Sequence, residues 1–271
     1  MSYYYFCKNS NLNYMSNLSA NTLFHFTRNK EALISILKTK FYPRLCQEEM
    51  VLFKGKGKVG YPMVCFCDIP LSQIENHTNT YGKYAIGLRK TWAIKLGITP
   101  ILYTHLNSLV CSHLRNNIGK ILLTQNMDLL DEMYISFFMK PYNGMQLVNG
   151  KKKRITFYNE REWRYIPPKE DLIIRNGGEA DLEQIGIFIE DLYHAKSPEL
   201  IQSDISLLNA RNEQFGLSFT PKDINYIIVE RESEILEIMD TVQNIKGNFS
   251  HNDVKLLSTR IISMERISED F

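Results

Sequence analysis

The sequence predicts an α+β fold, because short apolar strands alternate unevenly with amphipathic helices and no internal repeat is found. With 271 residues, of which 44% are hydrophobic, the chain is long enough to bury a substantial core. We expect residues 21–271 to form a single domain, preceded by an extended arm over residues 1–20 that is rich in Asn, Ser and Tyr. A helical insert is expected over about residues 105–140.

The first predicted strand, residues 21–27, is followed by a helix. Asn29 is a suitable N-cap for this helix, in which Leu33 and Leu37 recur at helical spacing. Lysine and glycine alternate in residues 54–60, so this segment is expected to be a flexible basic loop.

Three more strands are predicted before the insert. Residues 61–68 form an apolar run that stops before Pro70, and a helix or turn is expected over 71–77. Strands follow at 84–88 and 100–103.

Helices are predicted where apolar residues recur at intervals of three and four. A short helix capped by Thr91 ends near Gly97, and from 105 to about 138 the spacing of leucines and isoleucines fits longer helices with an apolar face. The charge run Lys151–Arg154 is expected to form a solvated turn before a strand at 155–157. Contact with nucleic acid is the less favoured alternative for this run.

The last third of the chain contains strand-like segments over 160–175 and a polar stretch over 179–215 with scattered helical signals. A strand at 224–229 precedes an amphipathic helix over 235–242. A final strand at 260–263 precedes a short acidic tail.

Composition and charge exclude several functional classes. The formal net charge is +2, which gives no global field to indicate nucleic acid or membrane as a partner. No leader or bilayer-spanning segment is evident, so a cytoplasmic protein is expected. The five cysteines lack the paired spacing of a zinc site and are expected to be reduced thiols, mostly buried, so no metal site is predicted.

Two candidate functional positions lie in the first two strands. In residues 23–27, alternation places His25 on the face opposite Phe24 and Phe26, where it would line a pocket floor or serve as a hydrogen-bonded structural residue. Asp68 ends the second strand, a position that suits either a functional carboxylate or the cap of the following helix.

The third candidate is the segment Phe157 to Tyr165. In a strand, Glu160, Glu162 and Arg164 would share one face. Two carboxylates so close repel each other unless a cation, a proton or a substrate relieves them, and Arg164 could be that cation. The alternative is an edge strand that is charged to prevent aggregation.

Other enzyme classes are not supported by motifs. No GxSxG occurs, no phosphate-binding glycine loop precedes a helix, and the histidines lack metal-ligand spacing. Cys65 and Cys67 lie in an apolar strand, where a thiol tends to stay protonated and unreactive.

Several blocks together resemble the AbiGi-like abortive-infection family, whose members act in defence against bacteriophage. The resemblance spans about residues 21–271, and its specificity comes from the order and spacing of these blocks: 23–27, 63–74, 81–88 with Trp92, Lys140-Pro141, 160–164 and 258–271. Members are described as the antitoxin-like half of a two-gene system. The resemblance therefore implies a cognate toxin or another defence protein as partner.

The same blocks also look like ADP-ribosyltransferases, which would imply a mixed-sheet core of that type with helical insertions and NAD as the cofactor. Transfer of ADP-ribose would need a protein or nucleic-acid acceptor. The positions that this likeness implies are two catalytic carboxylates and five cofactor-binding side chains: Glu160 and Glu162; His25, Thr27, Tyr81, Tyr84 and Arg164. A Ser-Thr-Ser block is absent and the spacing from His25 to the glutamates is long, so an inactive relative that binds a toxin stays an alternative.

Overall fold

The computed structural model describes residues 20–49, 58–124, 134–148, 151–169, 175–176, 179–180, 188–189, 205–207, 209–245 and 249–270. The expected arm over residues 1–20 lies outside this range except for Ala20. Most of the expected basic loop and of the polar stretch over 179–215 also lies outside it.

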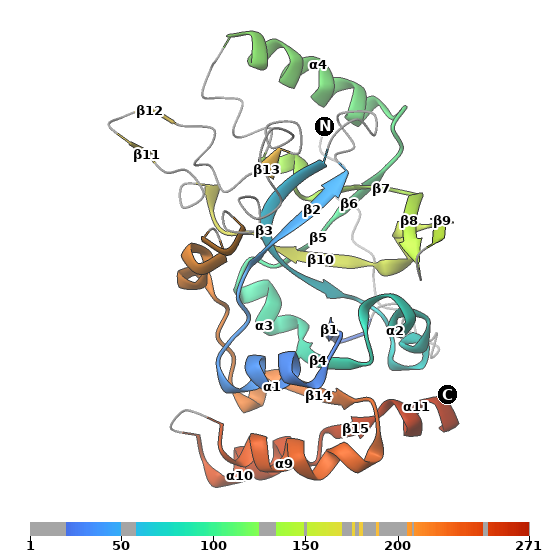
Figure 1. Cartoon of the computed structure of the whole chain (residues 1–271), viewed down its shortest axis with the longest axis vertical. Coiled ribbons are helices and arrows are strands. Elements are labelled where there is room, and N and C mark those ends of the chain that lie inside the picture. The colour runs from blue at the N-terminus through green and yellow to red at the C-terminus, as the bar shows by residue number, and fades with distance from the viewer. Residues whose placement is uncertain are drawn as a thin grey trace, which may run out of the picture.

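A mixed nine-stranded sheet forms the centre of the protein (Figure 1). Its path runs β15-β14-β4-β1-β3-β10-β5, and β2 and β13 also pair with β3. The β14–β15 pair is parallel, whereas the other pairs in this sheet are antiparallel. The strands are β1 (Thr22–Thr27), β2 (Arg44–Glu49), β3 (Lys58–Cys67), β4 (Tyr84–Arg89), β5 (Thr99–Pro100), β10 (Glu162–Tyr165), β13 (Phe188–Ile189), β14 (Ile224–Val229) and β15 (Ile261–Ser263).

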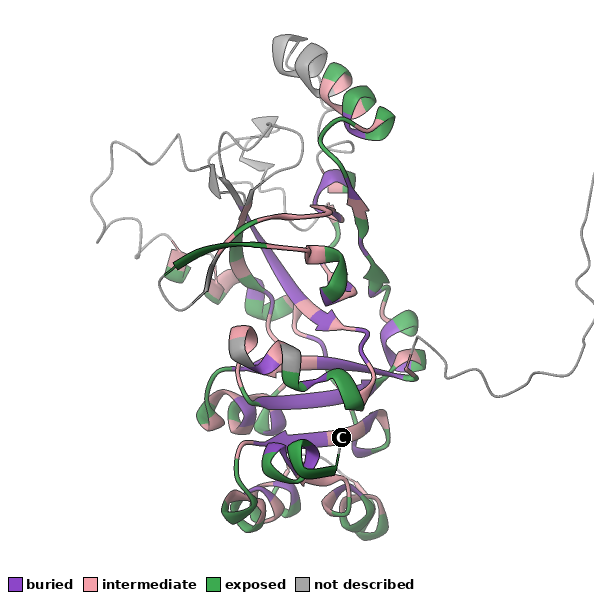
Figure 2. Cartoon of the chain, turned by 90° about the vertical axis from the view of Figure 1, so that its right-hand side faces the viewer, coloured by how far each residue is buried: buried purple, intermediate pink, exposed green. Residues whose placement is uncertain are grey.

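Helices cover both faces of the sheet, and Figure 2 shows the buried strands between helices whose outer sides are exposed. One face packs on α1, α3, α9 and α10. The other packs on α11 and on α2, whose His77 ring stacks with Phe26. The longer helices of the described residues are α1 (Lys30–Lys38), α2 (Glu75–Tyr81), α3 (Lys90–Lys95), α4 (Leu109–Thr124), α9 (Ile235–Gln243), α10 (His251–Ser258) and α11 (Met264–Asp270).

Short 3-10 turns and three small two-stranded sheets complete the description. The turns are η2 (Leu71–Gln73), η3 (Phe157–Glu160), η4 (Glu213–Phe215), η5 (Pro221–Asp223) and η6 (Glu232–Glu234). The small sheets pair β6 (Leu102–Thr104) with β7 (Met139–Pro141), β8 (Gly144–Val148) with β9 (Lys151–Ile155), and β11 (Arg175–Asn176) with β12 (Glu179–Ala180).

The strand β3 pairs with four other strands along its length. Its first half, from Lys58 to Met63, pairs with β2 on one side, and Val59 and Gly60 pair with β13 on the other. Its second half pairs with β10 from Val64 to Cys67 and reaches β1 at Cys67. Side chains alternate along the whole strand, so Tyr61, Met63, Cys65 and Cys67 face one way.

The α+β class and most of the expected elements are confirmed. Asn29 caps α1, because its side-chain oxygen accepts a hydrogen bond from the Ala32 amide at 2.9 Å. The strand at 224–229 and the helix with Ile238 and Val242 on its buried side are also present. The helix α4 lies within the expected insert.

The structure differs from the expected elements at four places. The helix expected from Thr91 begins at Lys90 with Arg89 as its N-cap. The strand expected at 100–103 breaks at Ile101, because β5 pairs with β10 whereas β6 pairs with β7. Residues 58–60 belong to β3 and not to a loop. The acidic tail is the helix α11, which buries Met264 and Ile267.

The charge run at 151–154 was expected to be a turn, and it is strand β9 instead. It is solvated, since all four cations are exposed, but the backbone pairs in register with β8. The strand expected at 155–157 is also wrong, because β9 ends at Ile155 and residues 157–160 form the 3-10 turn η3.

Candidate functional site

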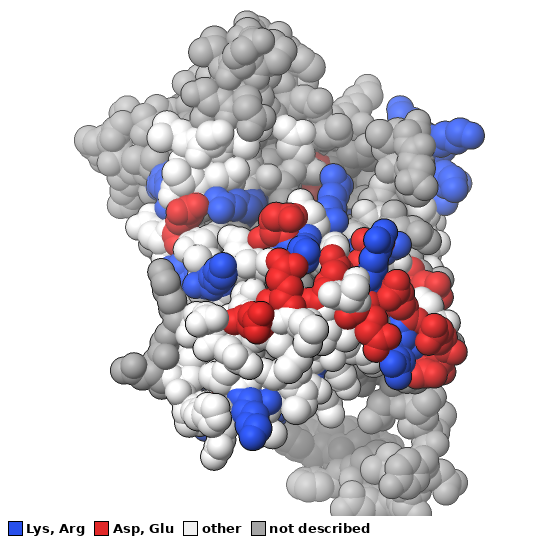
Figure 3. All heavy atoms as spheres, turned by 60° about the horizontal axis from the view of Figure 1, so that its bottom comes forward, with Lys and Arg blue, Asp and Glu red and all other residues white. Residues whose placement is uncertain are grey.

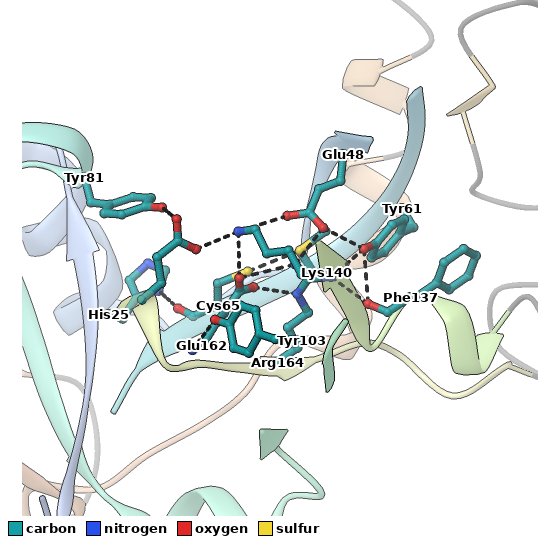
Figure 4. A network of polar contacts seen from close by, with 12 residues as sticks. His25, Glu48, Tyr61, Cys65, Tyr81, Tyr103, Phe137, Lys140, Glu162 and Arg164 are labelled. Carbon is teal, nitrogen blue, oxygen red and sulfur yellow. Dashed lines mark hydrogen bonds and ion pairs between the residues drawn. The ribbon is translucent and has the colours of Figure 1, made fainter. Parts of the chain in front are cut away.

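A buried network of charged side chains lies on the face of the sheet that carries Cys65 and Cys67 (Figure 4). The register pairs Glu162 with Cys67 and Arg164 with Cys65, so these side chains share one face. Lys140 on β7 and Glu48 on β2 reach the same place. The site therefore combines strands that are distant in sequence.

Arg164 is the centre of the network and is completely buried. Its Nε donates to Glu162 Oε1 at 2.5 Å, and one Nη donates to Glu48 Oε2 at 2.6 Å. The other Nη donates to the Tyr61 hydroxyl and to the Phe137 carbonyl oxygen, each at 2.6 Å. This planar donor fork is the reason that arginine, and not lysine, suits the position.

Lys140 joins the two glutamates that the sequence marks as candidate catalytic residues. Its Nζ donates to Glu160 Oε2 at 2.7 Å and to Glu162 Oε2 at 3.0 Å, and it lies 3.7 Å from Glu48 Oε1. Glu160 and Glu162 are only 7% and 5% exposed. Lys140 and Arg164 therefore supply the cations that two close carboxylates require.

Glu160 does not lie on the strand, contrary to the expectation. It ends the 3-10 turn η3, and Arg161 then adopts a left-handed conformation with φ 46° before β10 begins. This turn still directs Glu160 towards Lys140. Its other oxygen accepts a hydrogen bond from the Tyr81 hydroxyl at 2.6 Å, so both carboxylate oxygens are bonded inside the protein.

The pKa values of the two glutamates are shifted in opposite directions. Burial raises the pKa of Glu160, and the opposing effects of Lys140 and Tyr81 do not reverse this. Burial would also raise the pKa of Glu162, but Arg164 and then Lys140 outweigh it and lower that pKa to about 2. Three carboxylates meet two cations here, so a proton on Glu160 would balance the charge.

The pH dependence of stability follows from these opposite shifts. The lowered pKa of Glu162 stabilises the folded state above about pH 4.5, and this contribution is lost as the pH falls towards 2. The raised pKa of Glu160 acts the other way, because stability then falls as the pH rises above 4.5. Urea unfolding between pH 3 and 8 should therefore show a maximum near pH 5 in the contribution of this pair.

Single amides separate the two glutamates in this experiment. Glu160→Gln should flatten the neutral side of the profile. Glu162→Gln should remove a fall in stability on the order of 2 kcal/mol between pH 5 and pH 3. Glu213→Gln, at an exposed glutamate paired with Arg44, serves as the control and should leave the profile unchanged. An unaltered acid side in Glu162→Gln would contradict the assignment.

Three expected cofactor-binding residues lie on the opposite face of the sheet from Glu162 and Arg164. His25 packs against Phe41 and Phe66, and its Nδ1 lies 2.8 Å from the Cys65 carbonyl oxygen. Alternation along β1 places Thr27 on the same face as His25, and Tyr84 is directly opposite Thr27. Of the seven expected residues, the structure thus brings together Tyr81, Glu160, Glu162 and Arg164, but not His25, Thr27 or Tyr84.

His25, Thr27 and Tyr84 each make a hydrogen bond within the protein that is consistent with a structural role. Burial lowers the pKa of His25, which favours a neutral ring hydrogen-bonded to the backbone. The Thr27 hydroxyl donates to the Asn29 carbonyl oxygen at 3.2 Å. The Tyr84 hydroxyl donates to Glu234 Oε1 at 2.9 Å, beside α9.

Asp68 and the cysteines have definite places as well. Asp68 does not cap the following turn, whose N-cap is Pro70, and instead accepts a hydrogen bond from Lys90 Nζ at 2.7 Å.

The described cysteines are free: Cys111 is buried, Cys65 and Cys67 are half-buried, and Cys46 is exposed. Burial raises the pKa of the Cys65 and Cys67 thiols, which opposes a nucleophilic role.

Sequence reasoning missed half of the network, namely Glu48, Tyr61, Tyr103 and Lys140. Tyr103 accepts a hydrogen bond from the Glu162 amide at 2.9 Å through its hydroxyl. These residues lie on strands that are distant in sequence and meet only through strand pairing, so no local pattern marks them as site residues. Lys140 stood in one of the blocks that resemble the family, which was the only signal available.

Within the described ranges, no group of three or more His, Cys, Asp or Glu side chains is placed to hold a metal ion. In the same part of the chain, no helix combines the length and apolar character needed to cross a bilayer.

Comparison with known proteins identifies a family. A family model described as "Putative abortive phage resistance protein AbiGi, antitoxin" matches residues 39–230, which include the whole charged network. The abortive phage resistance protein AbiGi of Lactococcus lactis subsp. cremoris is 29% identical over 233 residues, covering 78% of this chain and 88% of the relative. No solved structure matches. The family model covers well over half of this chain, so this chain belongs to the AbiGi family of abortive phage resistance proteins.

Proposed function

We propose that this protein acts in abortive phage resistance as an antitoxin, which binds and neutralises a cognate toxin encoded beside it. The observation that carries the proposal is the state of Glu160 and Glu162. Both are buried, and Lys140 and Arg164 bond to their carboxylates within the fold. A catalytic carboxylate must contact its substrate, and these two contact the protein.

The arrangement of the other candidates supports the same proposal. An NAD site of the expected composition needs His25 and Thr27 on the same side of the sheet as the glutamates. Their side chains lie on the opposite face, among Phe41, Phe66 and the residues that α1 covers. The description of the family model as an antitoxin agrees with a binding role. ADP-ribosyl transfer with NAD is therefore the alternative that the experiment must test.

The test is protection of cells by co-expression. The protein encoded beside this chain is induced in a bacterial host with and without this chain, and viable cells are counted. We expect induction alone to stop growth and co-expression to restore colony formation. Affinity purification of this chain should recover the neighbouring protein in a fixed ratio, because neutralisation by binding requires a stable complex.

Glu160→Gln separates binding from catalysis. Glutamine has nearly the same shape as glutamate and can still accept a hydrogen bond, so the variant should fold and protect like the unaltered chain. Purified protein should release no nicotinamide from NAD above the blank. Release by the unaltered chain that disappears in Glu160→Gln, together with loss of protection, would overturn the antitoxin proposal and favour the NAD-consuming enzyme.

A further inference from the structure

The strands β8 and β9 form a basic hairpin outside the large sheet, next to β7 in Figure 1. The residues of β9 from Lys151 to Arg154 are four consecutive cations, and all four are exposed. Alternation places Lys151 and Lys153 on one side of the hairpin and Lys152 and Arg154 on the other, with neighbours on one side about 7 Å apart. Positive charge therefore faces solvent on both sides of the ribbon.

Within the described residues, no carboxylate neutralises these four cations. The residues opposite them in register are Val148, Leu147, Gln146 and Met145, none of which is acidic. Arg154 donates to the Asn143 side-chain oxygen at 3.2 Å, which leaves its charge uncompensated. By contrast, basic and acidic side chains are interleaved over much of the face shown in Figure 3. Ion pairs such as Lys83–Glu230 and Arg266–Glu232 compensate charge elsewhere in the protein.

Aromatic rings stand at the base of the same hairpin. Tyr142 precedes β8 and Tyr158 follows β9, and their rings stack with centroids 5.6 Å apart and an interplanar angle of 26°. Tyr158 is 53% exposed. His105, also exposed, adds a third ring 4.9 Å from Tyr142. Closure of the hairpin thus brings the two tyrosine rings together, and His105, which follows β6, completes the group.

We propose that the hairpin and this aromatic group bind single-stranded nucleic acid. Exposed cations along an extended ribbon match the repeated charge of a phosphate backbone, and partly exposed rings provide surfaces on which unpaired bases stack. Duplex DNA hides its base faces and would leave the rings without a role. An acidic protein surface would use the cations but not the stacked rings. The inference goes beyond the antitoxin role and does not depend on it.

Fluorescence anisotropy tests the proposal with labelled oligouridylate and oligodeoxythymidylate of about 20 nucleotides, a length that exceeds the footprint of one such site. A duplex of equal length and an excess of polyglutamate are compared in the same buffer. We expect binding at roughly 50 mM salt that weakens steeply at roughly 200 mM. Both single strands should bind more tightly than the duplex, and polyglutamate should compete poorly.

Variants assign the binding to the hairpin. Changing Lys151, Lys152, Lys153 and Arg154 together to glutamine should weaken binding on the order of 30-fold and reduce the salt slope by about 2 to 3. The matched control changes four exposed lysines elsewhere to glutamine, with the same loss of charge, and should bind nearly as well: Lys38, Lys95, Lys222 and Lys255. Tyr158→Ala should lose roughly tenfold, whereas Tyr158→Phe should keep its affinity because the ring is retained.

Three results would overturn the proposal. The first is equal affinity for the duplex and the single strands. The second is displacement of the labelled oligonucleotide by polyglutamate as effectively as by unlabelled single strand. The third is an equal loss of binding in the hairpin variant and in the four-lysine control variant. The midpoint of thermal unfolding is measured for every variant, so that a loss of binding can be distinguished from a loss of the folded structure. Toxin neutralisation is measured separately in cells, so failure of either proposal is recognised without the other.

Discussion

Arg164→Met is expected to lower the free energy of unfolding by about 3–5 kcal/mol, because it removes one partner of a buried ion-pair network. Methionine fills much of the same volume but donates no hydrogen bond. The carboxylates of Glu48 and Glu162, the Tyr61 hydroxyl and the Phe137 carbonyl oxygen would each lose a donor inside the protein. Lys140 alone cannot balance three carboxylates in that environment.

Urea unfolding at neutral pH measures this loss. Arg44→Met is the matched control, because Arg44 lies on β2 of the same sheet and pairs with Glu213 where both side chains are about half exposed. An exposed pair of this kind contributes about 0–1 kcal/mol. Arg164→Lys should fall between the two, since it keeps the charge but not the donor fork. A loss below about 1 kcal/mol in Arg164→Met would show that the network does not stabilise the fold.

Gly82→Ala is expected to have the second largest effect, a loss of about 3 kcal/mol or more. Gly82 has φ 107°, a conformation that other residues rarely adopt. A Cβ atom there would meet the Thr27 carbonyl carbon at 2.6 Å and lie even closer to its oxygen, so the backbone of β1 would have to move. Gly82 also follows Tyr81, whose hydroxyl bonds Glu160, so the strain would reach the charged network.

Gly97→Ala separates steric clash from backbone conformation. Gly97 also has a positive φ, 74°, but a Cβ atom there meets nothing within 4 Å. It should lose only about 1 kcal/mol, the ordinary penalty for alanine in a left-handed conformation. Thermal unfolding of both variants tests the comparison, and equal losses would mean that the contact with β1 has no effect.

Local patterns predicted the parts of the site that lie on a single strand. Alternation from Glu162 to Tyr165 correctly separated Glu162 and Arg164 from Trp163 and Tyr165. It failed one residue earlier, because the left-handed Arg161 ends the alternation and places Glu160 in a turn. A positive φ at an arginine has no sequence signature, since glycine is the residue normally found there.

Long-range pairing accounts for the rest of the site. Glu48 and Lys140 reach Arg164 and the glutamates only after β2, β3 and β7 are in register, and no periodicity within a strand reports its partner. The charge run at 151–154 shows the same limit. Four cations in sequence indicate a solvated segment, but only pairing with β8 makes them a ribbon.

The shared strand β3 also restricts how the length of the chain can change during evolution. Tyr61 lies in the half of β3 that pairs with β2, and Cys65 in the half that pairs with β10. One inserted or deleted residue between them would turn Tyr61 to the opposite face, away from Arg164, while Cys65 kept its place. We therefore expect insertions and deletions to accumulate in the connections around β3, and the spacing between these two positions to stay fixed.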